Sequence, residues 1–112
     1  MTGAKPMLAV MLALFWLAAI AGDAMALSAL ERQGRKLSVR LCAQCHAIGK
    51  SGASPRVGAP PLRHLEQRIN LDTFASRLRQ GLMSSHQDMP IFRFKREDAR
   101  AMIAYLRAIQ GP

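Results

Sequence analysis

The sequence predicts a small all-α domain of three to four helices. Three segments repeat apolar residues at the three- and four-residue spacing of a buried helix face, and no alternating strand pattern follows residue 26. A chain of 112 residues allows one small domain. Such a domain buries little apolar surface for the backbone entropy that it loses. We therefore expect a disulfide, a metal or a cofactor to complete the core.

An apolar leader precedes this domain. Lys5 comes before an apolar run from Met7 to Ala21, and Asp23 and the tripeptide Ala24-Met25-Ala26 follow it. A basic start, a short apolar stretch and small residues before a cleavage point are typical of a secretory signal peptide. A spanning helix needs about 20 apolar residues, so an uncleaved membrane anchor is the weaker alternative. We expect residues 1–26 to be a cleaved signal peptide, 27–112 to be the domain, and the protein to be periplasmic.

The two cysteines, Cys42 and Cys45, are separated by two residues, and His46 follows the second. Thiols at this spacing on a helical turn face the same way and reach the two vinyl groups of one porphyrin. The imidazole then binds the iron from one side. The motif therefore predicts one covalently attached haem c, which would complete the core.

Two other sites use similar residues. A thioredoxin-like dithiol needs a strand before a helix, and the sequence contains no such strand. A structural zinc site needs a fourth ligand, but His64 and His86 lack the paired spacing of zinc modules. Haem attachment is the better interpretation.

The first predicted helix runs from about Ala29 to the cysteine motif. Ser28 and Glu31 form a capping-box signature at its start. One face carries Leu30, Gly34, Leu37 and Leu41. A glycine inside a helix costs about 1 kcal/mol relative to alanine, so we expect another backbone or ring to lie close to Gly34.

Residues 49–61 are rich in glycine, serine, alanine and proline and predict a loop around the cofactor. The second helix starts with Asn70 or Asp72 as its cap and ends near Gly81. Its apolar stripe is formed by Leu71, Phe74, Ala75, Leu78 and Leu82.

The third helix follows a poor cap, Lys95, and carries Glu97 and Asp98 in its first turn. Its apolar stripe is formed by Ala99, Met102, Ile103, Leu106 and Ile109.

Four sequence features occur in a characteristic order along residues 28–110. They are the cysteine motif ending in His46, then Ala59-Pro60-Pro61-Leu62, then Asp88-Met89-Pro90, and Tyr105-Leu106 in the last helix. In this order the chain resembles the class I cytochromes c, in their bacterial single-haem branch. The resemblance implies a cytochrome c-like fold with helices wrapped around a covalently bound haem.

The resemblance also implies roles for individual residues. Cys42 and Cys45 would be the thioether anchors, His46 the proximal iron ligand and Met89 the distal one. The carbonyl of Pro60 would orient the proximal imidazole.

Two further positions match the family where its first and last helices cross: Gly34 and Tyr105. Two depart from its pattern: Ser38, where many relatives carry an aromatic residue, and Lys95, in place of a capping residue.

Other side chains compete for the distal position. Met89 precedes a proline in an irregular segment, where a side chain can turn inward, whereas Met102 lies on an apolar stripe and Met83 follows the second helix. An imidazole from His64 or His86 would give a lower reduction potential than a thioether.

With both axial positions filled by protein, the expected function is one-electron transfer between redox partner proteins rather than catalysis. Alternatives are a cytochrome subunit of a periplasmic dehydrogenase or oxidase, and a peroxidase or gas-binding protein if Met89 dissociates. The net charge of +9 predicts partners with an acidic docking face and does not indicate nucleic acid outside the cytoplasm. We expect a monomer that contacts membrane only through a retained leader. Arg63 and Arg68 are candidate partners of the haem propionates.

Overall fold

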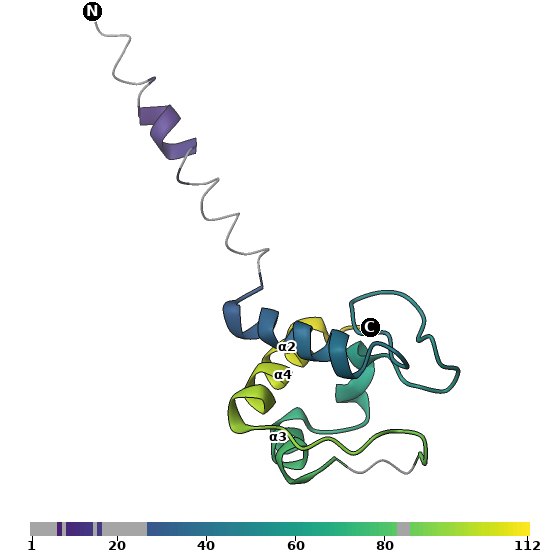
Figure 1. Ribbon diagram of the computed structural model, residues 1–112. Helices are drawn as coiled ribbons and strands as arrows, with labels where there is room; N and C mark the ends of the chain where they lie inside the picture. Colours follow the sequence, from purple (N-terminus) through teal and green to yellow (C-terminus); the bar gives the residue numbers. More distant parts are fainter. Residues whose placement is uncertain (1–6, 8, 15, 17–26, 83–85) are drawn as a thin grey trace, which may run out of the picture.

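The computed structural model describes residues 7, 9–14, 16, 27–82 and 86–112. The cleavage predicted after Ala26 and the competing ligand Met83 lie outside these residues. Within the described part, no helix is long and apolar enough to cross a membrane. The domain contains the helices α2 (Ala29–Leu41), η1 (Leu62–Gln67, a 3-10 helix), α3 (Leu71–Gln80) and α4 (Arg96–Ile109), shown in Figure 1. The predicted all-α class is therefore confirmed.

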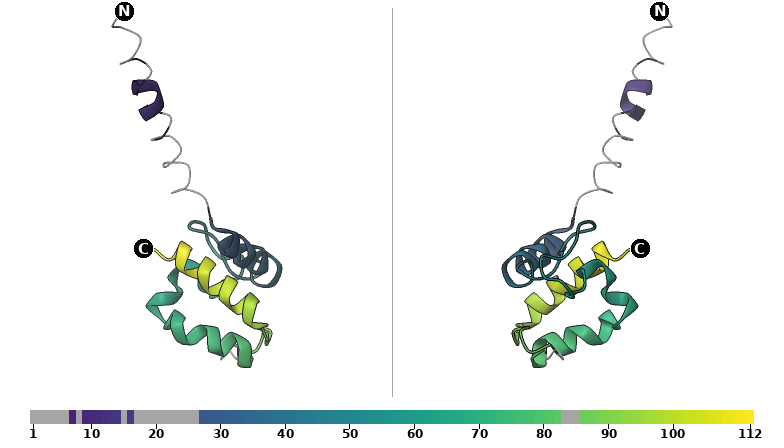
Figure 2. Two further views of the ribbon diagram at one scale, coloured as in Figure 1. Left: turned by 90° about the vertical axis from the view of Figure 1, so that its left-hand side faces the viewer. Right: turned by 90° about the vertical axis from the view of Figure 1, so that its right-hand side faces the viewer.

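Helix α4 is the centre of the fold. Figure 2 shows it between α2 and α3, and its most extensive contact within the described chain is with α2. The end of α4 is also tied to η1, because the Gln110 side chain donates to the Leu62 carbonyl at 2.8 Å and accepts from the Glu66 N–H at 3.0 Å. Every described helix of the domain thus depends on α4 for its position.

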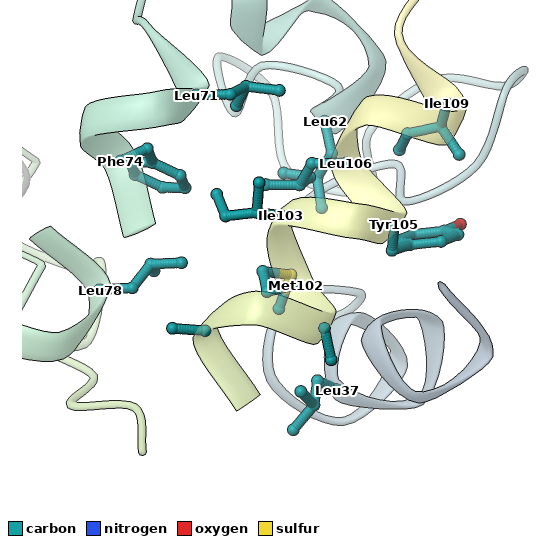
Figure 3. Close-up of a cluster of buried hydrophobic side chains, with 12 residues drawn as sticks. Leu37, Leu62, Leu71, Phe74, Leu78, Met102, Ile103, Tyr105, Leu106 and Ile109 are labelled. Carbon is teal, nitrogen blue, oxygen red and sulfur yellow. The ribbon is translucent and has the colours of Figure 1, made fainter. Parts of the chain in front are cut away.

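The hydrophobic core follows one side of α4. Figure 3 shows Leu71, Phe74 and Leu78 of α3 directed toward Ile103 of α4. Leu37 of α2 belongs to the same buried cluster. Because α2 and α3 both pack on α4 and not extensively on each other, space remains for a ligand between their inner faces.

Helix α2 begins as the sequence predicts. The Ser28 N–H donates to Glu31 Oε2 at 2.8 Å, and the Glu31 N–H donates to Ser28 Oγ at 3.2 Å, which forms a complete capping box. Gly34 and Leu37 are buried as expected, but Leu30 is 38% exposed. Leu30 shares this face by spacing but is less covered than Gly34 and Leu37.

Gly34 lies at the crossing of α2 and α4. A Cβ atom at Gly34 would lie 2.0 Å from the carbonyl oxygen of Ala101 and 2.6 Å from Cβ of Tyr105. The Tyr105 hydroxyl reaches across to the cysteine-bearing segment, where it donates to the Ile48 carbonyl at 2.6 Å. The predicted close approach is confirmed, and glycine at position 34 is required by it.

Ser38, one of the two residues that depart from the family pattern, is fully buried. Its hydroxyl lies 3.0 Å from the Gly34 carbonyl and 3.3 Å from the Met102 sulfur. A hydroxyl with partners costs far less to bury than an unpaired one. The serine is therefore compatible with a tight α2–α4 contact.

The ends of α3 and α4 agree with the sequence, with one correction. Asn70 caps α3 through a 2.7 Å bond from the Asp72 N–H, and Gly81 follows its end at φ 106°. Leu82, expected on the stripe of α3, lies beyond the helix because this glycine terminates it; it pairs instead with Phe92 in an isolated bridge. Lys95 precedes α4 without a side-chain capping bond, as expected.

Candidate functional site

The cysteine motif forms a tight turn at the end of α2. Cys42 is the C-cap residue, and its carbonyl accepts from the N–H groups of Cys45 at 3.1 Å and His46 at 2.9 Å. Both thiols are free and half-buried, and both line the same cavity. The turn thus places the two thiols and the imidazole at one wall.

The His46 ring is oriented by a backbone carbonyl. Its Nδ1 lies 2.7 Å from the oxygen of Pro60. A carbonyl oxygen only accepts hydrogen bonds, so Nδ1 carries the proton in the neutral ring and Nε2 keeps its lone pair. An imidazole held in this tautomer is suited to bind a metal through Nε2. Pro60 is the residue to which the family resemblance assigns this contact.

The cavity has a volume of about 280 Å³. Its wall is mainly apolar and takes residues from every helix of the domain and from the segments between them. The aliphatic and aromatic residues are Leu41, Leu62, Leu65, Ile69, Phe74, Leu78, Leu82, Phe92, Phe94 and Leu106. A cavity with this lining suits a large apolar group.

Burial affects the reactivity of the first thiol. The apolar surroundings of Cys42, and next the neighbouring Cys45 thiol, raise the pKa of Cys42 to about 11. The thiol of Cys42 is therefore protonated at neutral pH and is a poor metal ligand or redox nucleophile in this conformation.

The charged residues of the cavity differ from those that the sequence suggested. Arg56, Arg77 and Asp88 line it, whereas Arg63 and Arg68 do not. Arg56 forms an ion pair with Asp88. The hydrogen bond to the Asp88 carboxylate, and next its negative charge, raise the pKa of the Arg56 guanidinium. Arg63 and Arg68 stay predictions as propionate partners: neither lines the cavity, but one guanidinium nitrogen of Arg63, Nη1, is buried without a hydrogen-bond partner among the described residues.

Of the candidate distal ligands, Met89, Met102 and His86 line the cavity and His64 does not. Met102 is buried in the core, with its sulfur accepting from Ser38. Met89 is half-buried in an irregular segment and lies next to Asp88. Met83 lies outside the described residues. The geometry thus brings Met89, Met102 and His86 to the cavity that the thiols and His46 line, and Met89 is the one of the two thioethers that is not part of the buried core cluster.

Comparison with known families adds one finding. A family model described as cytochrome c oxidase, cbb3-type, subunit III matches residues 29–106. The chain belongs to this cytochrome c family. Comparisons with curated proteins and with solved structures give no match. The family is one of haem c domains that transfer electrons, so the chain is a cytochrome c-type electron-transfer protein.

The residues present fit the haem c that this cytochrome family implies. Two thiols separated by two residues, a tautomer-locked imidazole and an apolar cavity are the features that a covalently held porphyrin needs. A zinc site is disfavoured, since the described residues contain no group of three or more His, Cys, Asp or Glu side chains placed to hold a metal. A thioredoxin-like setting is disfavoured too, because a helix, not a strand, precedes the motif.

Several residues of the site were not predicted from the sequence. They are Leu62 and Leu65 on η1, Phe92 and Phe94 in the segment before α4, and the ion-paired Arg56. Phe92 and Phe94, two residues apart in an irregular segment, were a sequence signal for this part of the wall. Large aromatic side chains outside a helix are usually partly buried against other apolar groups. No local pattern relates Arg56 to Asp88, which are separated by more than thirty residues.

Proposed function

We propose that this chain is a periplasmic electron carrier in which Cys42 and Cys45 hold one haem c and His46 and Met89 ligate its iron. The observation that carries the proposal is the shared cavity, which both cysteines, His46 and Met89 line. Haem c, when bound, supplies a one-electron couple between ferric and ferrous iron. The leader pattern of residues 1–26 supports export as a signal peptide.

The protein's own residues have three tasks in this function. The thiols fix the position of the group, and the Pro60 carbonyl holds the His46 ring in the tautomer that leaves Nε2 available. The apolar wall excludes water, which lowers the cost of keeping the iron reduced and limits access of exogenous ligands. Ligation of the iron by both His46 and Met89 would leave no open coordination position and would favour electron exchange over oxygen or peroxide chemistry.

A fixed place in an oxidase complex is the second candidate. The observation that favours it is the description of the matching family as a subunit of a cbb3-type oxidase. A domain that serves one complex would copurify with it under mild conditions, whereas a free shuttle would be isolated alone and react with several partners. Affinity purification from the native membrane fraction, followed by mass spectrometry, separates these arrangements.

The charge distribution supports an acidic partner surface. The net charge is +9, and eleven of the basic residues on the described helices and loops are exposed around the domain. They are Arg32, Arg35, Lys36, Arg40, Arg56, Arg68, Arg77, Arg79, Arg93, Lys95 and Arg96. A net positive field speeds encounter with an acidic protein at low ionic strength. We expect the rate of electron exchange with an acidic partner to fall as salt is added.

The ligand assignment is tested by absorption spectroscopy of protein expressed in the periplasm with a haem maturation system. The ferric protein should show the weak far-red band that arises from thioether coordination. The band should disappear in Met89→Leu and persist in Met83→Leu. Loss in Met83→Leu with retention in Met89→Leu would contradict the assignment. Rapid binding of CO to the ferrous wild-type protein would instead support a gas-binding function.

A further inference from the structure

The segment that carries Met89 is attached to the rest of the domain at identifiable points. Its C-terminal side is held by two backbone bonds, from Leu82 N–H to Phe92 O at 3.1 Å and from Phe94 N–H to Leu78 O at 2.8 Å. Close to Met89 itself, one attachment is the ion pair between Asp88 and Arg56. The residue immediately before the thioether is therefore bound to another loop.

Arg56 is itself anchored to the cysteine motif. Its backbone N–H donates to the Cys45 carbonyl at 3.1 Å, while its guanidinium donates to the Asp88 carboxylate. Arg56 and Asp88 both line the cavity. One residue thus connects the thiol side of the cavity, by its main chain, to the Met89 segment, by its side chain.

We propose that the Arg56–Asp88 ion pair is a latch that holds Met89 in its ligating position and slows its replacement by exogenous ligands. This inference rests on the proposed His46 and Met89 ligation. Arg56 and Asp88 act as positioning residues, since they touch the segment that carries the ligand rather than the iron. An exposed ion pair contributes modestly, so we expect an effect on ligand exchange of about two- to five-fold.

A second ion pair provides a matched control. Arg107 of α4 pairs with Asp72 of α3, and neither residue lines the cavity. The exposed fractions of these side chains are 53% and 75%, compared with 41% and 61% for Arg56 and Asp88. Loss of either pair removes one exposed salt bridge between segments distant in the chain. Only loss of the Arg56 pair should change the behaviour of Met89.

The experiment measures the rate at which imidazole replaces Met89 in the ferric, haem-loaded full chain. At saturating imidazole the rate is limited by dissociation of the thioether, and loss of the far-red thioether band reports it in a stopped-flow spectrometer. Arg56→Gln and Asp88→Asn should each raise this rate about two- to five-fold, and the double variant should be no faster than either single variant. Arg107→Gln should leave the rate at the wild-type value.

Salt gives a second readout. High ionic strength screens exposed charges, so 1 M NaCl should raise the wild-type rate toward that of Arg56→Gln and leave Arg56→Gln unchanged. Equal rates in wild type and Arg56→Gln, or equal acceleration in Arg56→Gln and Arg107→Gln, would overturn the latch while leaving the ligand assignment intact. Absence of the thioether band from the wild-type protein would overturn both.

Discussion

Replacement of Gly34 by alanine tests the packing on which the whole domain depends. The added Cβ would lie 2.0 Å from the Ala101 carbonyl oxygen, 2.7 Å from its carbon and 2.6 Å from Cβ of Tyr105. Two of these atoms belong to the backbone of α4, so no rotation of a side chain relieves the contact. The helices must separate by roughly 1 Å or more to restore an ordinary contact distance.

The expected loss follows from two opposing effects. Overpacking of a tight contact costs about 1 to 3 kcal/mol, and a collision with a helix backbone belongs at the upper end. Alanine recovers about 1 kcal/mol of helix propensity relative to glycine. We therefore expect Gly34→Ala to lower the free energy of unfolding by about 2 kcal/mol. In a domain of this size, the corresponding fall in Tm is roughly 8 to 16 °C.

Thermal unfolding of the haem-loaded protein, followed by far-UV circular dichroism, measures this loss. Gly49→Ala is the control, because a Cβ at Gly49 meets nothing within 4 Å. The control should unfold within about 2 to 4 °C of the wild type, as a neutral surface change does. A Gly34→Ala protein as stable as wild type would refute the described approach of α2 to α4.

Three further predictions concern single side chains, those of Ser28, Tyr105 and Cys42. Ser28→Ala removes the capping box and should lower the free energy of unfolding, measured in urea, by about 1 kcal/mol. Tyr105→Phe removes the bond to the Ile48 carbonyl and should cost about 1 kcal/mol at neutral pH. Burial raises the pKa of Tyr105, so the folded state favours the neutral phenol. The free energy of unfolding of the wild type should therefore decrease as the pH rises above about 10. Tyr105→Phe has no phenol to ionise, so its free energy of unfolding should not show this contribution. In haem-free protein that keeps its helical circular dichroism, iodoacetamide should alkylate Cys42 more slowly at pH 9 than in urea, and the rates should converge above pH 11, because the pKa of Cys42 is about 11. Equal rates at pH 9 would contradict that value.

The helices were predictable because their signals are local. A capping box started α2, asparagine and glycine bounded α3, and apolar stripes gave the buried faces of all three α-helices. The errors occurred where tertiary contact decides. Leu30 belongs to the stripe by spacing but is 38% exposed, and η1 is too short to show a period of its own.

The site was predictable where chemistry imposes fixed spacing. A haem c attachment motif joins two thiols and an imidazole at a fixed short spacing, so Cys42, Cys45 and His46 were visible as a candidate motif. The arginines that line the cavity were not visible, because their positions depend on how separate loops fold together. Arg56 contacts Asp88 only after the residues 49–61 and the Met89 segment meet at the cavity.

The contact between α2 and α4 has a consequence for the order of events during synthesis. These helices stand at opposite ends of the domain, so the most extensive helix pairing in the described chain is complete only after α4 has been synthesised and, in the proposed periplasmic protein, exported. Closure of so long a loop is slow compared with formation of local turns. Until then Cys42 and Cys45 lie on a chain that has no completed core. If haem c is attached as proposed, this topology leaves an interval, before the last helix docks, in which both thiols are accessible for the attachment.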